Sequence, residues 1–574
     1  MPQVFSRRSF LRTAMGTGLA LALPRGLAGC GGEGPAVTAT TRPPRVLFIS
    51  IDSFPPAYLT LNSRGEKGGR DGDWLMPNVR RFLEEATLFA DARDYLPAAT
   101  DMNHLNAVAG TSSAQTGINS VSIQAYNWNA DGKARMERPS LSWARDDRGR
   151  PVDTLFAAWK RRWPGSRTFY LTGKSWVGEM FRVPNSGVDT IVTGSNFPGY
   201  LSPPPEKYNF YDPPGDEDAR SDPESIIQAG GALLFLTRDP EHFPCDAWIV
   251  DSALQVLDRE RPDLGVILMA QLDDTQHSFG SVSDPDDYVS CGNRPCGFQS
   301  RRNPWSFREP VLDAARDVDR QFGRLIEGIL SMPDYRDAVL VLYSDHGHAN
   351  HLRQDDLGKS TDMVEILYQA GAISEAEKKG NGFSPMGLSS MGALYWRADS
   401  LEDRRDRART AREVLLRYRT LNPETGVSEC PWVVAAHEDM IRGIAGVAQP
   451  GELWHPYFGP NNDRENLLWP DLVVLMKNGW QAPTYGNILE NVGIILPFTI
   501  PPITIFVGGH GAPDTQRILM AMRGPGIARG RVITDPGYAA DYRISDLALT
   551  VAQLCGLRLV STTVGRDRCA DLAG

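Results

Sequence analysis

Apolar runs that end in acidic residues or histidine recur along the chain. Arg45–Asp52 is an apolar run that closes on a carboxylate, and Leu264–Leu272 and Ala338–Tyr343 are followed by Asp273 and by Ser-Asp345-His. A continuous apolar run of this length predicts a strand that is buried on both faces, as in a parallel sheet. In open α/β sheets, ligands bind beyond the carboxyl ends of the strands. The pattern therefore predicts polar side chains gathered at one edge of a sheet.

Segments with helical periodicity separate these strands. Pro77 begins a stretch with apolar residues at helical spacing, and Thr154–Trp163 is predicted to be a helix before a strand at Arg167–Leu171. A long amphipathic helix is predicted over Val311–Ile329, and another strand over Ile503–Val507. This alternation predicts an α/β fold, a three-layer α/β/α sandwich with a largely parallel central sheet.

The stretch from about 352 to 500 interrupts the alternation of strands and helices. It contains helical patterns at Asp362–Ala370 and Ala408–Leu421 and a strand pattern at Leu472–Met476. We expect this stretch to form a cap inserted into one large domain over 45–574, because the sequence shows no internal repeat.

The N-terminus has the pattern of an export signal. Two adjacent arginines precede an apolar run, Ala14–Leu23, that is too short to span a bilayer. Residues 1–29 resemble a twin-arginine signal followed by a lipobox, in which cleavage leaves Cys30 as a lipid-bearing N-terminus. Residues 30–44 would then be a flexible tether. These features predict export to a periplasmic or other extracytoplasmic location, with membrane contact only through a lipid on Cys30.

Charge and cysteine content limit the classes of partner. The formal net charge of −10 argues against nucleic acid as a bulk partner. Without Cys30 six cysteines remain, an even number that suits an oxidising compartment, and we expect the pairs Cys291–Cys296 and Cys555–Cys569. Their spacings differ from those of zinc ribbons, so a thiolate metal site is not expected.

Asp and His residues at the strand ends have the chemistry of metal ligands. Asp273 and His277 are four residues apart and can point an oxygen and an imidazole nitrogen at one cation. Asp345 and His346 are adjacent before a glycine, and His510 lies between glycines after the predicted strand that ends at residue 507. Each of these motifs alone could belong to an ordinary surface loop. Such loops do not explain why several predicted strands all end in Asp or His, the residue types that bind metal.

Thr100 is the candidate nucleophile. It follows a loop-like Leu-Pro-Ala-Ala and precedes a predicted helix at Met102–Val108, whose free N–H groups and dipole attract an anion. A threonine hydroxyl is a weak nucleophile that needs an adjacent base or a metal ion. The alternative is a helix N-cap without chemistry, which is the commonest role of threonine at such a position. Metal ligands elsewhere in the chain decide between the two.

Taken together, these motifs resemble the alkaline phosphatase superfamily, in particular its type I phosphodiesterase and nucleotide pyrophosphatase branch. The ordered motifs of that branch are a strand ending in Asp, Thr-x-x-Asn-His, Asp-x-x-x-His, Asp-His-Gly and Gly-x-His-Gly, and each has a match here from about Arg45 onward. One departure is Asp101-Met102 after the threonine, which puts an extra carboxyl group beside the nucleophile.

The resemblance implies a phosphoester hydrolase with two Zn²⁺ ions, or other divalent metals, and a covalent phosphothreonine. Its implied ligands for one ion are Asp273, His277 and His510. For the other they are Asp52, Asp345 and His346 with Thr100. It also implies an Asn that binds a phosphoryl oxygen, for which Asn127 is the nearest match, although it lies further from Thr100 than usual.

The sequence leaves two classes of small-molecule substrate open, phosphomonoesters and phosphodiesters. A monoesterase needs extra cations for the dianion, and Lys174 is a candidate, although an isolated lysine is more often a solvated surface residue. A diesterase needs an apolar wall, which Trp128, Trp176 or Phe181 would supply, although buried aromatic residues are usually core. We favour a phosphodiesterase or nucleotide pyrophosphatase, with a phosphomonoesterase as the alternative.

Two alternatives of other classes follow from the same residues. One is a non-catalytic zinc-binding surface lipoprotein, against which the intact Thr100 and six ligands argue. The other is a transferase that passes the phosphoryl group to an alcohol. A sulfatase is not expected, because the chain lacks the Cys-x-Pro-x-Arg motif of that family.

Overall fold

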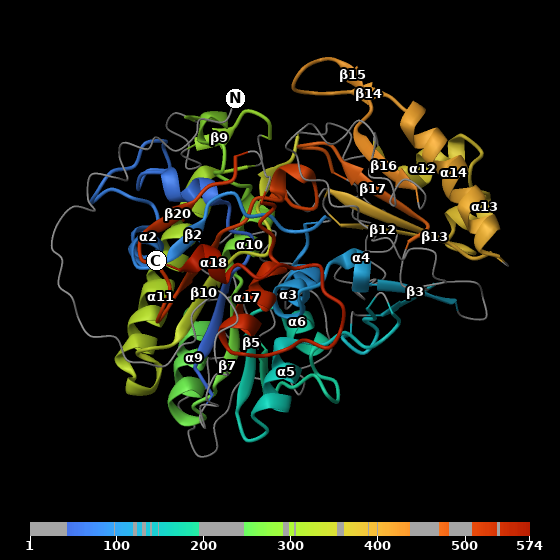
Figure 1. Ribbon diagram of the computed structural model, residues 1–574. Coiled ribbons are helices and arrows are strands. Elements are labelled where there is room, and N and C mark those ends of the chain that lie inside the picture. The colour runs from blue at the N-terminus through green and yellow to red at the C-terminus, as the bar shows by residue number, and fades with distance from the viewer. Residues whose placement is uncertain are drawn as a thin grey trace, which may run out of the picture.

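An eight-stranded mixed sheet forms the centre of the protein (Figure 1). The computed structural model describes residues 43–96, 98–116, 118, 123–128, 134–137, 140–146, 148–193, 246–290, 298–303, 306–352, 361–388, 390–398, 400–436, 470–481, 508–536 and 540–573. The strand order is β20-β2-β19-β10-β1-β7-β5-β6. Their bounds are β1 Val46–Ile51, β2 Thr87–Phe89, β5 Thr168–Thr172, β6 Thr190–Thr193, β7 Leu264–Met269, β10 Val339–Tyr343, β19 Met520–Arg523 and β20 Arg531–Ile533.

Most neighbouring strands of this sheet are parallel. β1 lies between β10 and β7 and is parallel to both, and β5 is parallel to β7 and β6. The exception is β19, which is antiparallel to β10 and β2. The predicted largely parallel sheet is therefore confirmed.

Helices cover both faces of the sheet. Alternate strand residues point to opposite sides, and since β1 has apolar residues on both sides, both faces must be buried. Val46 and Phe48 pack on the face covered by α3 (Thr100–Ala109), α5 (Leu155–Arg162), α6 (Ser175–Met180) and α17 (Asp546–Leu554). Leu47 and Ile49 pack on the face covered by α2 (Pro77–Glu84), α9 (Asp246–Arg259) and α11 (Arg308–Ser331). The fold is the expected three-layer α/β/α sandwich.

A smaller four-stranded sheet with its own core lies at one end of the molecule (Figure 1). Its order is β12-β13-β17-β16, all antiparallel. The elements are β12 Phe383–Leu388, β13 Met391–Trp396, β16 Trp432–Ala436 and β17 Leu472–Met476, with helices α12 Met363–Gln369, α13 Glu375–Lys378 and α14 Leu401–Arg417. We call this unit the cap.

The helix expected at Ala408–Leu421 differs in its bounds from α14. Ser400 caps α14 eight residues before the apolar pattern begins at Ala408, because its side chain accepts a hydrogen bond from the Asp403 N–H. The helix ends at Arg417, and Leu421 belongs instead to a short hairpin of β14 (Thr420–Leu421) and β15 (Ser428–Glu429).

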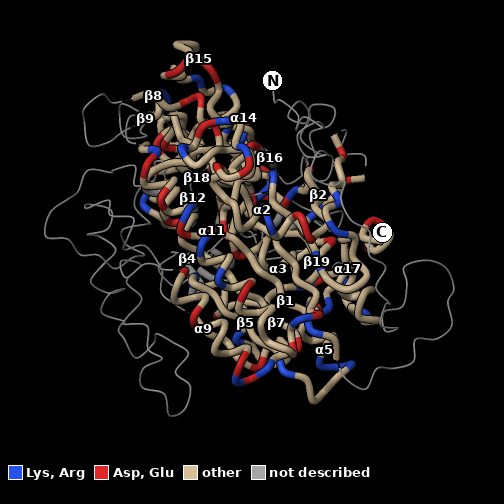
Figure 2. Tube along the Cα trace, turned by 90° about the vertical axis from the view of Figure 1, so that its left-hand side faces the viewer, with Lys and Arg blue, Asp and Glu red and all other residues tan. Residues whose placement is uncertain are grey.

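Oppositely charged residues are interspersed along the described chain (Figure 2). On α14, Arg409 pairs with Asp406 at 2.5 Å and Arg417 pairs with Glu413 at 3.3 Å. Exposed pairs of this kind contribute little each.

The expected disulfide between Cys555 and Cys569 is wrong. Neither cysteine is part of a disulfide, and the buried Cys569 Sγ donates a hydrogen bond to the Thr550 carbonyl oxygen at 3.6 Å. Cys291 and Cys296 lie outside the described residues, as do Cys30 and the predicted strand Ile503–Val507. Within the described part of the chain, every helix is too short or too polar to cross a membrane.

The close packing of β7 against β5 yields a stability prediction. A Cβ atom at Gly265 would lie 1.8 Å from the Phe169 ring, so Gly265→Ala should lower the free energy of unfolding by about 1–3 kcal/mol. The matched control is Gly165→Ala, because a Cβ atom there meets nothing within 4 Å. Urea denaturation of the three proteins measures the difference. Equal losses in both variants would contradict this account of the packing.

Candidate active site

The carboxyl ends of the central strands bring the predicted ligands to one place. Asp52 follows β1, and Asp345 and His346 follow β10. Asp273 and His277 lie one turn apart on α10 (Gln271–Phe279), which begins directly after β7. His510 follows β18 (Gly508–Gly509), which pairs with β11 (Ala349–Asn350) just after the Asp-His-Gly-His motif. Parallel neighbours thus place residues that are distant in sequence at one edge of the sheet.

Two groups of side chains are close enough to hold a metal ion. One comprises Asp273, His277 and His510, and the other comprises Asp52, Asp273 and His346, with ligand atoms within 4.8 Å of one another in each. The first group equals a ligand set that the resemblance implied. The second contains Asp273 where that resemblance implied Asp345, but Asp345 Oδ2 lies only 3.1 Å from His346 Nε2. All six predicted protein ligands therefore gather around one buried point.

The orientation of the histidines fits metal binding. His277 Nδ1, His346 Nδ1 and His510 Nδ1 face the carbonyl oxygens of Gly508, Gly347 and Ala98 at 3.3, 3.0 and 2.6 Å. A carbonyl oxygen only accepts, so each ring carries its proton on Nδ1 and keeps the lone pair on Nε2. Burial lowers the pKa of His510 well below its usual range, and the nearby His346 lowers it further. Neutral imidazoles of this tautomer are the form that binds metal.

Carboxylate oxygens in the site are buried without hydrogen bonds. Asp52 Oδ1 and Asp273 Oδ1 both lack a hydrogen-bond partner, although both residues are almost completely buried. A buried, unpartnered carboxylate oxygen is costly unless a cation meets it. Carboxylate oxygen with imidazole nitrogen is a donor set that suits zinc, so the residues fit the expected metal.

Thr100 lies beside these ligands. It is the first residue of α3, and its N-cap is Ala99, whose side chain makes no capping bond. Thr100 Oγ1 is 3.2 Å from His346 Nε2. His104, one turn later, contacts the Thr100 carbonyl oxygen at 2.7 Å and Ser50 Oγ at 3.1 Å, which fixes the start of the helix against β1. Thr100 is therefore the first residue of the helix and not its N-cap.

Lys174 is buried at the centre of the site and is not a solvated surface residue. Its Nζ lies 2.9 Å from Asp52 Oδ2, 2.5 Å from Asp273 Oδ2 and 3.5 Å from Thr100 Oγ1. Burial lowers the pKa of Lys174, but the charges of Asp273 and Asp52 outweigh burial and raise the pKa well above its usual range. The site thus has a fixed ammonium group within reach of the candidate nucleophile.

One ammonium group does not offset all the carboxylates. Burial raises the pKa of Asp52 well above its usual range, and the neighbouring Asp345 raises it further. Burial acts on Asp273 in the same direction, but Lys174 and His277 lower its pKa well below the usual range. For Asp345 burial is opposed by His346 and His104, which lower the pKa to about 2. Of these three carboxyl groups, Asp52 is therefore the one whose protonated form is most favoured.

Asp101 gives the site a further acidic group. Both of its carboxyl oxygens are buried and accept no hydrogen bond. Burial raises the pKa of Asp101 to about 7. The extra carboxyl group beside Thr100 therefore carries less negative charge than an exposed aspartate would.

Of the remaining candidates, one is in the core, one is partly buried beside Lys174, and two have side chains outside the described residues. Phe181 is core, because its ring stacks on Tyr170 with centroids 4.6 Å apart. Trp176 is partly buried, and its ring centre lies 5.9 Å from Lys174 Nζ. Asn127 and Trp128 belong to β3 (Ile123–Trp128), but their side chains lie outside the described residues.

The cap contacts the site directly through the turn between β12 and β13. The Ser390 N–H donates to the His510 carbonyl oxygen at 3.1 Å, and Ser390 Oγ lies 3.3 Å from His351 Nε2. The Ser390 carbonyl oxygen accepts from the Met476 N–H of β17 at 2.8 Å. The cap is therefore joined to the loop that carries His510.

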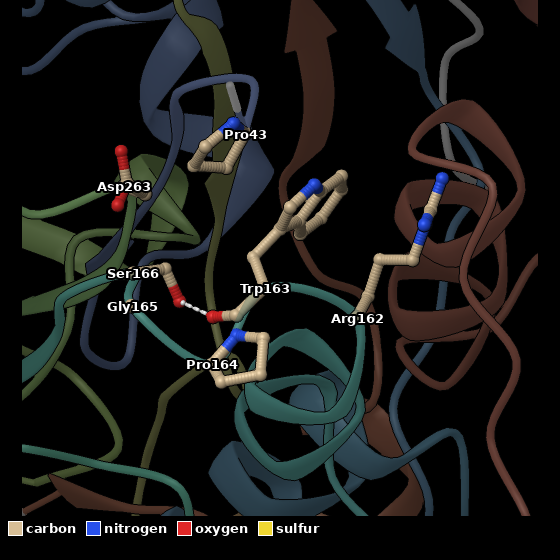
Figure 3. A pocket seen from close by; sticks show the side chains of 7 residues that line it. All are labelled: Pro43, Arg162, Trp163, Pro164, Gly165, Ser166 and Asp263. Atoms are coloured by element: carbon tan, nitrogen blue, oxygen red, sulfur yellow. Dashed lines mark hydrogen bonds between the residues drawn. The ribbon is translucent and has the colours of Figure 1, made fainter. Parts of the chain in front are cut away.

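A cavity of about 460 Å³ lies away from these residues (Figure 3). Its lining includes Asp263, just before β7, and Ser166, just before β5, whose hydroxyl donates to the Trp163 carbonyl oxygen at 2.7 Å. These residues mark the amino ends of the parallel strands. The cavity is thus at the opposite edge of the sheet from the gathered ligands.

Two residues of the site had no role assigned from the sequence. Ser53 follows Asp52, and its Oγ lies 2.8 Å from His348 Nδ1. The centre of the His348 ring is 4.9 Å from the centre of the His277 ring. The second histidine of the Asp-His-Gly-His motif was the available signal for His348. Ser53 gave no signal, because serine after a strand is ordinary.

Comparisons with known proteins agree with this architecture. The model of the type I phosphodiesterase / nucleotide pyrophosphatase family matches residues 46–488. No curated protein matches the sequence. An inactive variant of murine ectonucleotide pyrophosphatase / phosphodiesterase 5, solved in complex with AMP, is similar with a TM-score of 0.53 and 12% identity, over 92% of this chain and 100% of that one. Phosphonoacetate hydrolase from Sinorhizobium meliloti, solved in complex with phosphonoacetate, is similar with a TM-score of 0.50 and 15% identity, over 89% of this chain and 96% of that one.

The structural similarities, at these identities, support the fold alone. The family match is broader evidence, because it spans well over half of the 574 residues and includes Thr100 and five of the six gathered ligands. The protein belongs to the type I phosphodiesterase / nucleotide pyrophosphatase family and is a phosphoric ester hydrolase.

Proposed function

We propose that Thr100 is the nucleophile and that two divalent ions, zinc by the chemistry of the donors, bind around it. The observation that carries this proposal is the position of Thr100 Oγ1, 3.2 Å from His346 Nε2 and 3.5 Å from Lys174 Nζ at the start of α3. A threonine that served only the helix would point its hydroxyl at the backbone. Here the hydroxyl points into the group of carboxylates and imidazoles.

Each ion would have its own ligand set. Asp273, His277 and His510 would hold one, and Asp52, Asp345 and His346 with Thr100 the other. When bound, paired ions lower the pKa of a coordinated hydroxyl group and offset charge on phosphoryl oxygens. The protein positions Thr100 on a ten-residue helix whose N-terminal N–H groups face an anion.

The reaction would proceed in two displacements at phosphorus. Thr100 Oγ, having released its proton to solvent, forms a bond to phosphorus as the ester oxygen leaves with its electron pair. The departing oxygen takes a proton from water, which gives a phosphothreonine and the free alcohol. Water then attacks phosphorus, the bond to Thr100 Oγ breaks, and the hydroxyl group is restored. Lys174, which stays protonated, is placed to stabilise negative charge on Thr100 Oγ or on a phosphoryl oxygen.

The preferred substrates would be phosphodiesters, including nucleotide-like esters. The half-buried Trp176 beside Lys174 offers an apolar surface for the second ester group. The family description and the AMP complex of the murine enzyme agree with this class. The buried ammonium of Lys174 favours a second candidate, the hydrolysis of phosphomonoesters, because a dianion gains most from an additional cation.

We also propose that the chain is exported by its twin-arginine-like N-terminus and anchored through a lipid on Cys30. This proposal rests on the sequence pattern of residues 1–44 alone.

Substitution of the nucleophile tests the covalent route. Thr100→Ala should lower kcat/KM for bis-(p-nitrophenyl) phosphate by at least ~10³-fold, because no side-chain oxygen remains to attack. Thr100→Ser is the matched control and should keep most of the rate. Metal content measured by mass spectrometry on each variant shows whether the site stays loaded. Unchanged hydrolysis by the alanine variant would contradict the proposal.

The buried carboxyl of Asp52 makes metal binding depend on pH. Its pKa is raised, so below that raised pKa Asp52 holds a proton that the metal must displace. Zinc affinity should therefore fall as the pH falls from 8 to 5.5, with protons released on binding. Chelator competition, corrected for protonation of the chelator, measures the affinity, and calorimetry in buffers of different ionisation enthalpy counts the protons. An affinity independent of pH would contradict this role of Asp52.

Variants of Lys174 and Trp176 should separate the two substrate classes. Lys174→Met should lower kcat/KM for p-nitrophenyl phosphate about 10- to 100-fold more than for its diester, the value of a charge-assisted hydrogen bond. Trp176→Ala should affect the diester more. The ratio of kcat/KM for the monoester to kcat/KM for the diester is compared between variants, because a loss of folded or loaded protein lowers both values equally. Equal losses on both substrates would show that these residues do not discriminate.

A further inference from the structure

Ser53 has a left-handed backbone at the centre of the site. Its φ is 61°, in a region that residues other than glycine rarely adopt. Such a conformation costs of order 1 kcal/mol or more and persists only where the surroundings hold it. The residue is fully buried directly after Asp52.

Three polar atoms of Ser53 contact two other segments, the loop after β10 and helix α10. Its N–H donates to Asp345 Oδ1 at 3.0 Å, after β10. Its carbonyl oxygen accepts from Gln276 Nε2 on α10 at 2.9 Å. Its hydroxyl lies 2.8 Å from His348 Nδ1. The strained residue therefore links the ends of β1 and β10 with the helix that carries Asp273 and His277.

His348 continues this link to the other ligand set. Its Nδ1 lies 3.6 Å from Asp273 Oδ1 as well as 2.8 Å from Ser53 Oγ. Its Nε2 is buried without a hydrogen-bond partner and packs against Gly508, where a Cβ atom would approach to 2.9 Å. The Ser53 hydroxyl is within 3.4 Å of the Gly347 carbonyl oxygen, which takes its proton. The pattern therefore assigns the imidazole proton to Nδ1, directed at Ser53 Oγ with Asp273 Oδ1 close by.

We propose that Ser53 and His348 form a positioning pair that holds Asp345 and Asp273 at a fixed separation and so couples the binding of the two metal ions. Asp345 belongs to one predicted ligand set and Asp273 to the other. The Ser53 N–H fixes Asp345 so that its second oxygen faces His346, while the His348 ring limits the movement of Asp273. Neither Ser53 nor His348 is a metal ligand. The inference rests on the proposed function, because it requires two ions.

Groups that hydrogen-bond to metal ligands have measurable effects on affinity. Their removal typically weakens metal binding 10- to 100-fold. Here the two residues act as one unit through a single hydrogen bond. Loss of either residue should therefore weaken the binding of both ions. Loss of both residues should lower the affinity little more than loss of one.

The experiment uses the full chain and zinc or cobalt alone. Ser53→Ala, His348→Ala and the double variant are titrated with Zn²⁺ against a chelator, and the Co²⁺ absorption spectrum reports ligand geometry. Ser53→Gly removes the hydroxyl and accepts the left-handed backbone, so it should fold even where alanine does not. The matched control is Asn185→Gly, which relieves another left-handed residue, of φ 68°, at an exposed position.

Each single variant should bind both ions about 10- to 100-fold more weakly, with an altered Co²⁺ spectrum, while Asn185→Gly binds them as the unchanged protein does. Affinities that stay unchanged in Ser53→Gly and His348→Ala would overturn the pair. A loss confined to one ion, or additive losses in the double variant, would overturn the coupling. If the unchanged protein binds no zinc, the proposed function itself fails, so the two failures are distinguishable.

Discussion

The mutual repulsion of buried carboxylates is the constraint on which this site depends. Asp52, Asp273 and Asp345 converge where water is excluded, and a single ammonium, that of Lys174, lies among them. Buried charges of one sign are costly unless cations meet them. The raised pKa of Asp52 shows where the compensation is incomplete. Binding of divalent cations would satisfy that deficit, which is why the arrangement favours metal chemistry over a purely structural role.

The sheet supplies the convergence. β1 lies between β7 and β10 in parallel register, so three chain segments more than 70 residues apart end side by side. The apolar strands that support these ends are completely buried, which leaves little freedom for the ligands to separate. The cap adds a second connection, because Ser390 hydrogen-bonds to the loop of His510. Changes in the cap can thereby reach the site without altering a ligand.

Much of this site could be predicted from the sequence, because apolar strands that close on Asp or His are local signals. The cap strand Leu472–Met476 was predicted to the residue because a short, continuous apolar run is a local signal as well. The burial of Lys174 could not be predicted, since it depends on which segments fold over it. The pairing of Cys555 with Cys569 was wrong because proximity in sequence does not imply proximity of two sulfur atoms. The roles of Ser53 and His348 depend on a left-handed backbone and on contacts between distant loops, which no local pattern encodes.

The central claim is that a threonine oxygen attacks phosphorus before water does. The stereochemistry at phosphorus tests it most directly. A phosphorothioate diester of known configuration, hydrolysed in ¹⁸O-labelled water, gives a chiral product whose configuration can be assigned. Two successive in-line displacements, the first by Thr100, predict net retention of configuration. Net inversion would show a single direct attack by water and would contradict the account.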